Sequence, residues 1–357
     1  MKHFFELIQV ALGNREQLTA ALSSKEWGQL YSLANKQSLV SFLIDGLNKL
    51  PESQRNLGQS LLLEWIGSGL QTENYNRLQN ERSKELYERF KKAGYRSCIL
   101  KGQGTATYYE HPEHRQCGDI DIWVDGERDE ILKYITEREL VTDGIDVQHT
   151  NVQFFSDVEV EVHFLPSFMY SPVNNGKLQR FFAEKTEEQF KNYDSHLGYA
   201  RTTVDFDLVF SLVHIYRHVF SEGIGMRQLI DYYHILIHSD DKQRTDAIKV
   251  LDTLGMTRFA GGIMWILREC FGMKESFQLC PENADYGKFL LSEIMIAGNF
   301  GHYDTRVKKI DSHKRLKRGF SQFRKNLRFM QYYPSEVLWS PFWKLWHWCW
   351  RKWKGYL

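Results

Sequence analysis

The stretch from Ser97 to Asp125 constrains the fold more than any other part of this chain. It reads SCILKGQGTATYYEHPEHRQCGDIDIWVD: an apolar run, a Lys-Gly turn, a short helical segment and a second apolar run that carries Asp119 and Asp121. Because side chains alternate along a strand, these two aspartates should share one face with Trp123, opposite an apolar face. Neighbouring carboxylates repel and raise each other's pKa, so replacing either by Asn should relieve the repulsion. A cation between them would also relieve it, and hard oxygen ligands favour Mg²⁺ or Mn²⁺.

The order of motifs in this stretch resembles the nucleotidyltransferases of the DNA-polymerase-β superfamily, whose pattern is a strand, a Gly-containing turn, a helix and a strand ending in Asp-x-Asp. It is most similar to the branch described only as uncharacterised nucleotidyltransferases, where the turn reads Lys-Gly and an Arg precedes the Asp-x-Asp. The positions that carry the resemblance are Lys101, Gly102, Arg115, Asp119 and Asp121. The resemblance implies an α+β fold. Its polymerase-β-like nucleotidyltransferase core, a small mixed sheet with helices, would be flanked by N- and C-terminal helical regions.

Two alternating runs, at 146–155 and 157–165, predict a β-hairpin, and the second run offers a third carboxylate. The superfamily places its third carboxylate on a strand beside the Asp-x-Asp strand. The branch tends to have Glu-x-His there, and this chain has Glu161-Val162-His163. The resemblance therefore implies Glu161 as the third carboxylate, with Glu159, on the same strand face, as the alternative.

The implied activity is metal-dependent transfer of NMP from an NTP, such as ATP, to an acceptor. Asp119, Asp121 and Glu161 are the implied catalytic residues and ligands of two Mg²⁺ or Mn²⁺ ions, and Glu161 would also take the acceptor proton. The implied nucleotide-binding residues are Lys101, Gly102, Gly104, Arg115 and Arg227.

The segment from Asp205 to His238 is predicted to be helical. Arg227 is positioned either to reach a phosphate or to pair with Asp231, four residues later. His214 and His218 also share a helix face, but no accompanying Glu or third ligand favours zinc, so packing or phosphate contacts are expected.

Two sequence features favour other functions. The turn reads Leu-Lys-Gly-Gln-Gly where the superfamily usually has Gly-Ser or Gly-Gly, which motivates a catalytically inactive nucleotidyltransferase fold that binds nucleotide or regulates. The basic stretch at 306–328 motivates a nucleic-acid-binding protein, although no RNP, KH or zinc-finger signature is present. The acceptor is left open among a protein, a sugar or polysaccharide precursor and another small molecule, and nucleic acid is not indicated.

Composition limits function little. With 42% hydrophobic and 25% charged residues the chain is typical of a globular protein, and a net charge of +1 favours no class of partner. The cysteines lack a Cys-x-x-Cys spacing, so neither a zinc site nor a disulfide framework is predicted. The first residues lack the apolar run of a signal peptide, and no run of about 18 apolar residues exists. We therefore expect a cytoplasmic protein without a transmembrane segment.

Periodicity and the resemblance together predict four segments: an N-terminal helical region at 1–94, the nucleotidyltransferase core at 95–204, a C-terminal helical region at 205–300 and a basic, Trp-rich helical tail at 301–357. Within the first, separate helices are expected at 57–70 and 71–92, with Gly94 as the stop signal. Residues 166–177 contain two prolines and an Asn-Asn-Gly sequence and are predicted to form a loop.

The tail contains a stripe of tryptophans at helical spacing: Trp339, Trp343, Trp346, Trp350 and Trp353. Pro341 fits a helix start. We expect the stripe to pack on the helical part of the protein, since exposed indoles are costly. Peripheral contact with a membrane is the alternative, because Lys and Arg surround the stripe.

Overall fold

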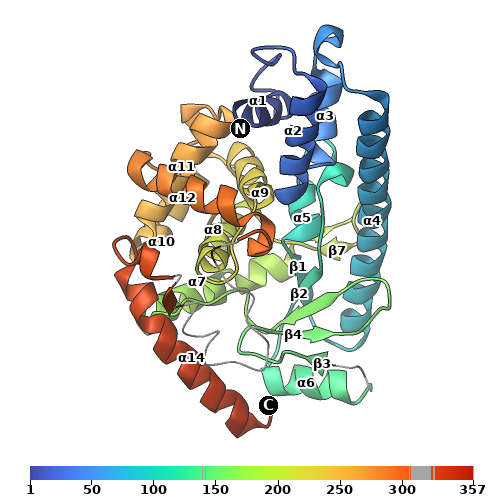
Figure 1. Cartoon of the computed structure of the whole chain (residues 1–357). Helices are drawn as coiled ribbons and strands as arrows, with labels where there is room; N and C mark the ends of the chain where they lie inside the picture. The colour runs from blue at the N-terminus through green and yellow to red at the C-terminus, as the bar shows by residue number, and fades with distance from the viewer. Residues whose placement is uncertain (139, 141, 305, 307–322, 325, 357) are drawn as a thin grey trace.

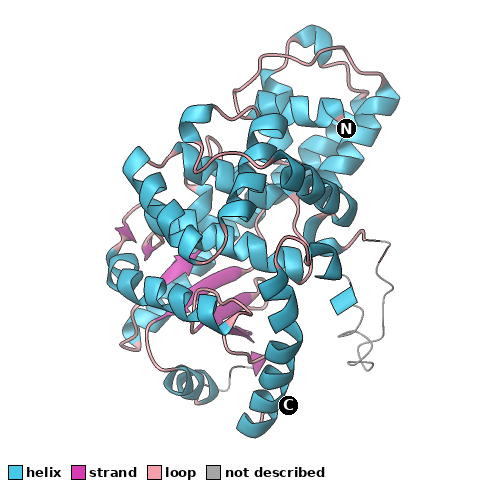
Figure 2. Ribbon diagram, turned by 90° about the vertical axis from the view of Figure 1, so that its left-hand side faces the viewer, coloured by secondary structure: helices cyan, strands magenta, loops and turns pink. Residues whose placement is uncertain are grey.

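Figure 1 shows the computed structural model, which describes residues 1–138, 140, 142–304, 306, 323–324 and 326–356. A small mixed sheet lies beside a larger helical region (Figure 2). The strands are β1 (Ser97–Leu100), β2 (Ile120–Val124), β3 (Thr142–Asp143), β4 (His149–Val152), β5 (Val160–His163), β6 (Tyr193–Asp194) and β7 (Tyr199–Ala200). The helices are α1 (Lys2–Ala11), α2 (Ser24–Lys36), α3 (Phe42–Lys49), α4 (Gln59–Lys92), α5 (Gly102–Ala106), α6 (Arg128–Thr136), α7 (Pro172–Lys191), α8 (Val204–Phe220), α9 (Met226–Ile237), α10 (Asp241–Thr253), α11 (Thr257–Phe271), α12 (Ala284–Ala297) and α14 (Pro334–Lys354). The α+β fold is thus as predicted.

The main sheet has the strand order β1-β2-β5-β4-β3. Strands β1 and β2 are antiparallel, β2 and β5 are parallel, and β4 pairs antiparallel with β5 as the predicted hairpin. In the β2–β5 register Asp121 lies opposite Glu161, and Trp123 lies opposite His163. Because paired residues of neighbouring strands project to the same face, this register places Glu161 beside Asp121.

Alternation along β2 separates two cores. Ile120, Ile122 and Val124 belong to a cluster with Phe90 of α4 and Ile131 of α6. On the other face, Trp123 stacks against Phe206 of α8 with ring centroids 6.0 Å apart, within the large core of the helical region. The face that carries Asp121 and Glu161 is therefore covered by the α8 side of the molecule.

Helix α4 runs without interruption from Gln59 to Lys92, so the prediction of two helices was wrong. Gly69 is required there by close packing, because a Cβ at this position would lie 2.3 Å from Ile44 Cδ1. The helix ends as predicted before Gly94, whose φ of +88° suits glycine.

Two other expectations were also wrong. The second half of the predicted loop at 166–177 belongs to α7, which starts at Pro172 and includes the Asn-Asn-Gly sequence, because Ser171 caps the helix and proline is favoured in its first turn. In the tail, α14 begins at Pro334 and contains Pro341 within its length. Most of the basic stretch at 306–328 lies outside the described residues. No described helix is both long enough and apolar enough to cross a bilayer. The expected segment boundaries remain predictions.

Candidate functional site

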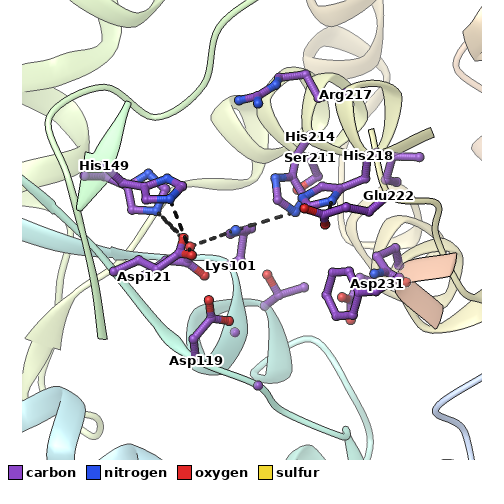
Figure 3. Close-up of a pocket in the computed structure, with 18 of the residues that line it drawn as sticks. Lys101, Asp119, Asp121, His149, Ser211, His214, Arg217, His218, Glu222 and Asp231 are labelled. Atoms are coloured by element: carbon purple, nitrogen blue, oxygen red, sulfur yellow. Dashed lines mark hydrogen bonds and ion pairs between the residues drawn. The ribbon is translucent and has the colours of Figure 1, made fainter. Parts of the chain in front are cut away.

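A pocket of about 380 Å³ opens between the sheet and helices α8 and α9. We call Lys101, Asp119, Asp121, His149, Glu161 and His163 its sheet side, because they lie in or next to β1, β2, β4 and β5. We call Arg115, His214, Arg217, His218, Arg227 and Asp231 its helix side, since all but Arg115 belong to α8 or α9. Figure 3 shows Lys101 extending between Asp121 on one side and His214 on the other.

The structure brings the three predicted carboxylates together. One oxygen each from Asp119, Asp121 and Glu161 lies within 4.8 Å of the other two. Asp121 lies in strand β2, and Asp119 is the residue immediately before this strand. Glu161 lies in the parallel strand β5. Such a set of oxygen donors fits a hard divalent cation such as Mg²⁺ or Mn²⁺. Glu159, the alternative, is exposed and lies outside this group.

Asp121 already has two cationic neighbours. Its Oδ1 lies 2.8 Å from Lys101 Nζ and 2.8 Å from His163 Nε2. Burial by itself would raise the pKa of Asp121, but Lys101 and His163 hold it below its usual value. For His163, burial acts in the opposite direction, yet the hydrogen bonds to Asp121 and Glu161 raise its pKa to about 9. Asp121 is therefore a carboxylate and His163 an imidazolium near neutral pH.

Asp119 is in a different electrostatic situation. Burial, together with the charges of Asp121 and Glu161, raises its pKa to about 7, despite the nearby Lys101. The repulsion predicted from the Asp-x-Asp pattern thus raises the pKa of Asp119 but not that of Asp121, because Lys101 and His163 outweigh it there. Replacement of Asp121 by Asn should relieve the repulsion on Asp119, but it would also leave Lys101 and His163 without their shared carboxylate.

His149 and His163 form a second cluster with Glu161. His149 Nε2 lies 3.6 Å from one oxygen of Glu161, and His163 Nε2 lies 3.3 Å from the other. Burial and the neighbouring His163 lower the pKa of His149, so this ring is neutral at pH 7. The motif Glu-x-His contained the signal for His163, whereas His149 sits one strand away in β4 and no local pattern distinguished it.

Only part of the Lys-Gly turn reaches the pocket. Lys101 immediately precedes α5 and has φ +49° and ψ −146°, an uncommon conformation for a residue with a Cβ. Lys101 and Gly102 line the pocket. Gly104 does not: its N–H donates to the carbonyl oxygen of Lys101 at 2.9 Å, and a Cβ there would lie 3.3 Å from the Cβ of Arg201. The structure thus gives Gly104 a packing role and leaves Lys101 and Gly102 at the pocket.

Two buried guanidinium groups mark the helix side. Arg115 forms a bidentate ion pair with Asp231 at 2.7 and 2.8 Å, and Arg227 donates to the carbonyl oxygen of Gln116 at 2.6 Å. Asp231 therefore pairs with Arg115 rather than with its helical neighbour Arg227. The buried Nη1 of Arg115 and Nε of Arg227 have no hydrogen-bond partner among the described residues. Both residues line the pocket, and their buried charge with unused donors suits an anion.

The histidines of α8 also line the pocket. His214 Nε2 lies 3.5 Å from Lys101 Nζ, and the rings of His214 and His218 are 4.3 Å apart. Burial and the charge of Lys101 hold the pKa of His214 well below its usual range. The groups of three candidate metal ligands among the described residues do not include either histidine.

A second groove, of about 910 Å³, adjoins the first on the far side of the carboxylates. Asp119, Glu161, Gly118 and Phe300 line both spaces. Its remaining walls come mainly from the β4–β5 hairpin between Asn151 and Val160. The carboxylates thus stand at the junction of two spaces, a geometry that two substrates of one reaction require.

No curated protein matches the chain. A family model described as uncharacterised nucleotidyltransferase matches residues 23–272, which include all of the main sheet and helices α2 to α11. The chain therefore belongs to the uncharacterised nucleotidyltransferase family.

Proposed function

We propose that this protein is a metal-dependent nucleotidyltransferase that moves NMP from an NTP to an acceptor. The observation that carries the proposal is the meeting of Asp119, Asp121 and Glu161 within 4.8 Å at the wall of a pocket. Across the pocket lie the unused donors of two buried guanidinium groups. One wall suits divalent cations and the other suits a phosphate chain, and a metal–nucleotide complex presents both.

The three carboxylates would hold Mg²⁺ or Mn²⁺. Bound metal would neutralise the phosphate charge and stabilise the attacking and leaving oxygens. The fit rests on the donor set, because the three residues supply only oxygen atoms and Asp119 lacks a close cationic partner among the described residues.

The residues of the chain divide the remaining tasks. Arg115 and Arg227 would bind the outer phosphates through their unused N–H donors, and Asp231 fixes the orientation of Arg115. Lys101 would join them by turning from Asp121 to the phosphates. Glu161 would accept the acceptor proton, because it lines both spaces. It is ionised near neutral pH, since the His163 hydrogen bond lowers its pKa although burial opposes this.

The inactive nucleotide-binding fold is a second candidate, favoured by one observation. The ammonium of Lys101 occupies a position 2.8 Å from Asp121, where it already neutralises a metal-binding carboxylate. If Lys101 does not leave this carboxylate, nucleotide can bind through the helix side without turnover.

One experiment separates the two candidates. The protein is incubated with each α-³²P-labelled NTP, Mg²⁺ or Mn²⁺, and cell extract. Transfer of label that disappears with Asp119→Asn supports the enzyme. Nucleotide binding by calorimetry without transfer under any of these conditions supports the inactive fold, and the absence of both contradicts the two candidates together.

A further inference from the structure

The two spaces that meet at the carboxylates differ in charge. Lysine, arginine and histidine side chains line much of the first pocket. Among the described residues, the second groove is lined by none of these three types. It offers instead amide and hydroxyl groups, three aromatic rings and carboxylates, among them those of Asn151, Gln153, Ser156, Tyr75, Phe155 and Glu159.

We propose that the second groove binds the acceptor, and that the acceptor is an uncharged or cationic molecule with a free hydroxyl or amine, such as a sugar or an amine. This rests on the proposed transferase function. Amides and carboxylates accept hydrogen bonds from hydroxyl and ammonium groups, and aromatic rings pack against apolar faces. A phosphorylated acceptor would face Glu159, and Arg82, a basic side chain beside the groove, already forms a bidentate ion pair with Asp157. Nucleic acid requires Lys or Arg contacts to its backbone.

The chemical step balances within this arrangement. The acceptor oxygen or nitrogen forms a bond to the α-phosphorus, and the bond from that phosphorus to the bridging oxygen breaks. The acceptor proton passes to Glu161 and from there to water, and pyrophosphate leaves from the first pocket.

The test fractionates cell extract on an anion-exchange resin before labelling with α-³²P-NTP. We expect transfer with the unbound fraction, which contains neutral and cationic molecules. We also expect Glu159→Lys to raise the KM for that fraction at least tenfold without changing NTP affinity. The matched control Glu275→Lys, an exposed glutamate on another surface, should change neither. Transfer only with the bound fraction, or an unchanged KM in Glu159→Lys, would overturn the acceptor assignment while leaving the transferase intact. Absence of label with every fraction would contradict the transferase itself.

A second inference comes from α14, which lies along the periphery of the molecule (Figures 1 and 2). One side of this helix is anchored. Glu336 accepts backbone hydrogen bonds from Tyr170 and Ser171 at 2.9 and 3.0 Å, and Trp343 stacks on Phe168 with centroids 4.4 Å apart. Trp350 lies 4.9 Å from the Arg128 guanidinium. The expected self-packing therefore holds for two tryptophans of the predicted stripe.

The opposite side of α14 is exposed. With 3.6 residues per turn, six of the exposed large apolar residues fall within an arc of about 120°, along a helix about 30 Å long, and a seventh, Trp348, is 46% exposed outside this arc. Their exposed fractions are 52% for Leu338, 44% for Trp339, 65% for Phe342, 62% for Leu345, 52% for Trp346 and 81% for Trp353. An apolar face of this length on the described surface is typical of a docking site.

The charge on the helix indicates which partner fits. No Asp or Glu occurs between Val337 and Leu357, whereas four basic residues do: Lys352 borders the apolar face, and Lys344, Arg351 and Lys354 lie further round the helix. Against a second copy of the same face, these basic residues would meet like charges with no acid to pair. Anionic lipid headgroups supply the opposite charge, and tryptophan with lysine is the composition of helices that lie in the bilayer interface.

We propose that the exposed face of α14 binds the surface of an anionic lipid bilayer. The probe is a set of vesicles of phosphatidylcholine with and without one quarter phosphatidylglycerol, used in sedimentation with the full chain. We expect binding to the anionic vesicles, weakened by 0.5 M salt, and a blue shift of tryptophan fluorescence. Phe342→Glu combined with Trp346→Glu should reduce partitioning at least tenfold.

Leu63→Glu provides the matched control, because Leu63 is 61% exposed on α4, away from α14, and should bind as the unmodified protein does. Circular dichroism melting checks that each variant is folded, and both are expected to keep their Tm because the positions are exposed. Equal partitioning of the double variant and the control would overturn the proposal, as would absence of binding to anionic vesicles. A dimer in light scattering that the double variant abolishes would assign the face to a second copy and also overturn it.

Discussion

The sheet side and the helix side of the pocket differ in how their charges are balanced. On the sheet side three carboxylates converge. Asp121 contacts Lys101 and His163, and Glu161 contacts His163, whereas Asp119 has no ion-pair partner among the described residues. On the helix side, Arg115 and Arg227 retain buried nitrogens without partners among the described residues. One side therefore has an excess of negative charge and the other unused donors. A divalent cation bound to a phosphate chain would complete both, which explains why neither arrangement is self-sufficient.

The largest effect is expected from removing charge on the sheet side. Asp119→Asn and Asp121→Asn should each lower nucleotidyl transfer by about 1000-fold, because each loses an oxygen ligand of the proposed metal. Transfer of label from α-³²P-NTP measures this. Wild-type turnover in both variants would remove the metal site from the sheet side.

The same two variants should move the stability of the metal-free protein in opposite directions. Asp121→Asn leaves Lys101 and His163 without their buried acid and should lower the free energy of unfolding by about 3 kcal/mol. Folding raises the pKa of Asp119 from 3.8 to about 7, so the folded state holds this proton more tightly. The Asp119 carboxyl therefore destabilises the fold increasingly as the pH rises through this range.

Asp119→Asn should accordingly raise the Tm at pH 8 in EDTA and change it little near pH 4. Denaturation of both variants at the two pH values makes the comparison. Parallel shifts of Tm would show that Lys101 and His163 do not distinguish the two aspartates.

Glu161→Gln should lower turnover about 100-fold, whereas Glu159→Gln at saturating acceptor should change it little. The reason is that Glu161 completes the carboxylate group and would accept the proton, while Glu159 is exposed outside it. Steady-state kinetics of the pair provide the test, with each variant serving as the control of the other. Small and equal effects of the two substitutions would contradict a role of Glu161 in metal binding and proton transfer.

Metal affinity should depend on pH through Asp119. Because its pKa is raised to about 7, a proton competes with the metal below this value. The affinity for Mn²⁺, measured by calorimetry, should fall roughly tenfold between pH 8 and pH 6, as expected for the release of one proton. In Asp119→Asn the affinity should be weaker at both pH values and nearly independent of pH. A pH dependence that survives in this variant would locate the titrating group elsewhere.

The smallest expected effect tests whether Lys101 contacts the phosphates as well as Asp121. Lys101→Ala should weaken NTP binding about tenfold and NMP binding less, because its proposed phosphate contacts are to the outer phosphates. Calorimetric titrations with the two nucleotides measure the difference. An equal loss for both would confine Lys101 to its contact with Asp121.

Some of this architecture followed from local pattern. The alternation of Asp-Ile-Asp-Ile-Trp predicted a strand with an acidic face, and the hairpin that carries Glu161 was recognised from two alternating runs. The continuous helix α4 was not, since Gly69 resembles a break and its packing against Ile44 is visible only in three dimensions. The same holds for α7, where Asn-Asn-Gly follows a capped, proline-initiated turn of helix.

The sequence by itself determined which residues share a strand face, Asp119 with Asp121 among them, because side-chain alternation is a local property of the backbone. Only the tertiary structure decided the partners of these charges. Glu161 lies beside Asp121 through the pairing of β2 with β5, Arg115 meets Asp231, and Lys101 reaches Asp121. It also decided which tryptophans of α14 are partly covered, since a periodic stripe states that a face exists but not what lies against it.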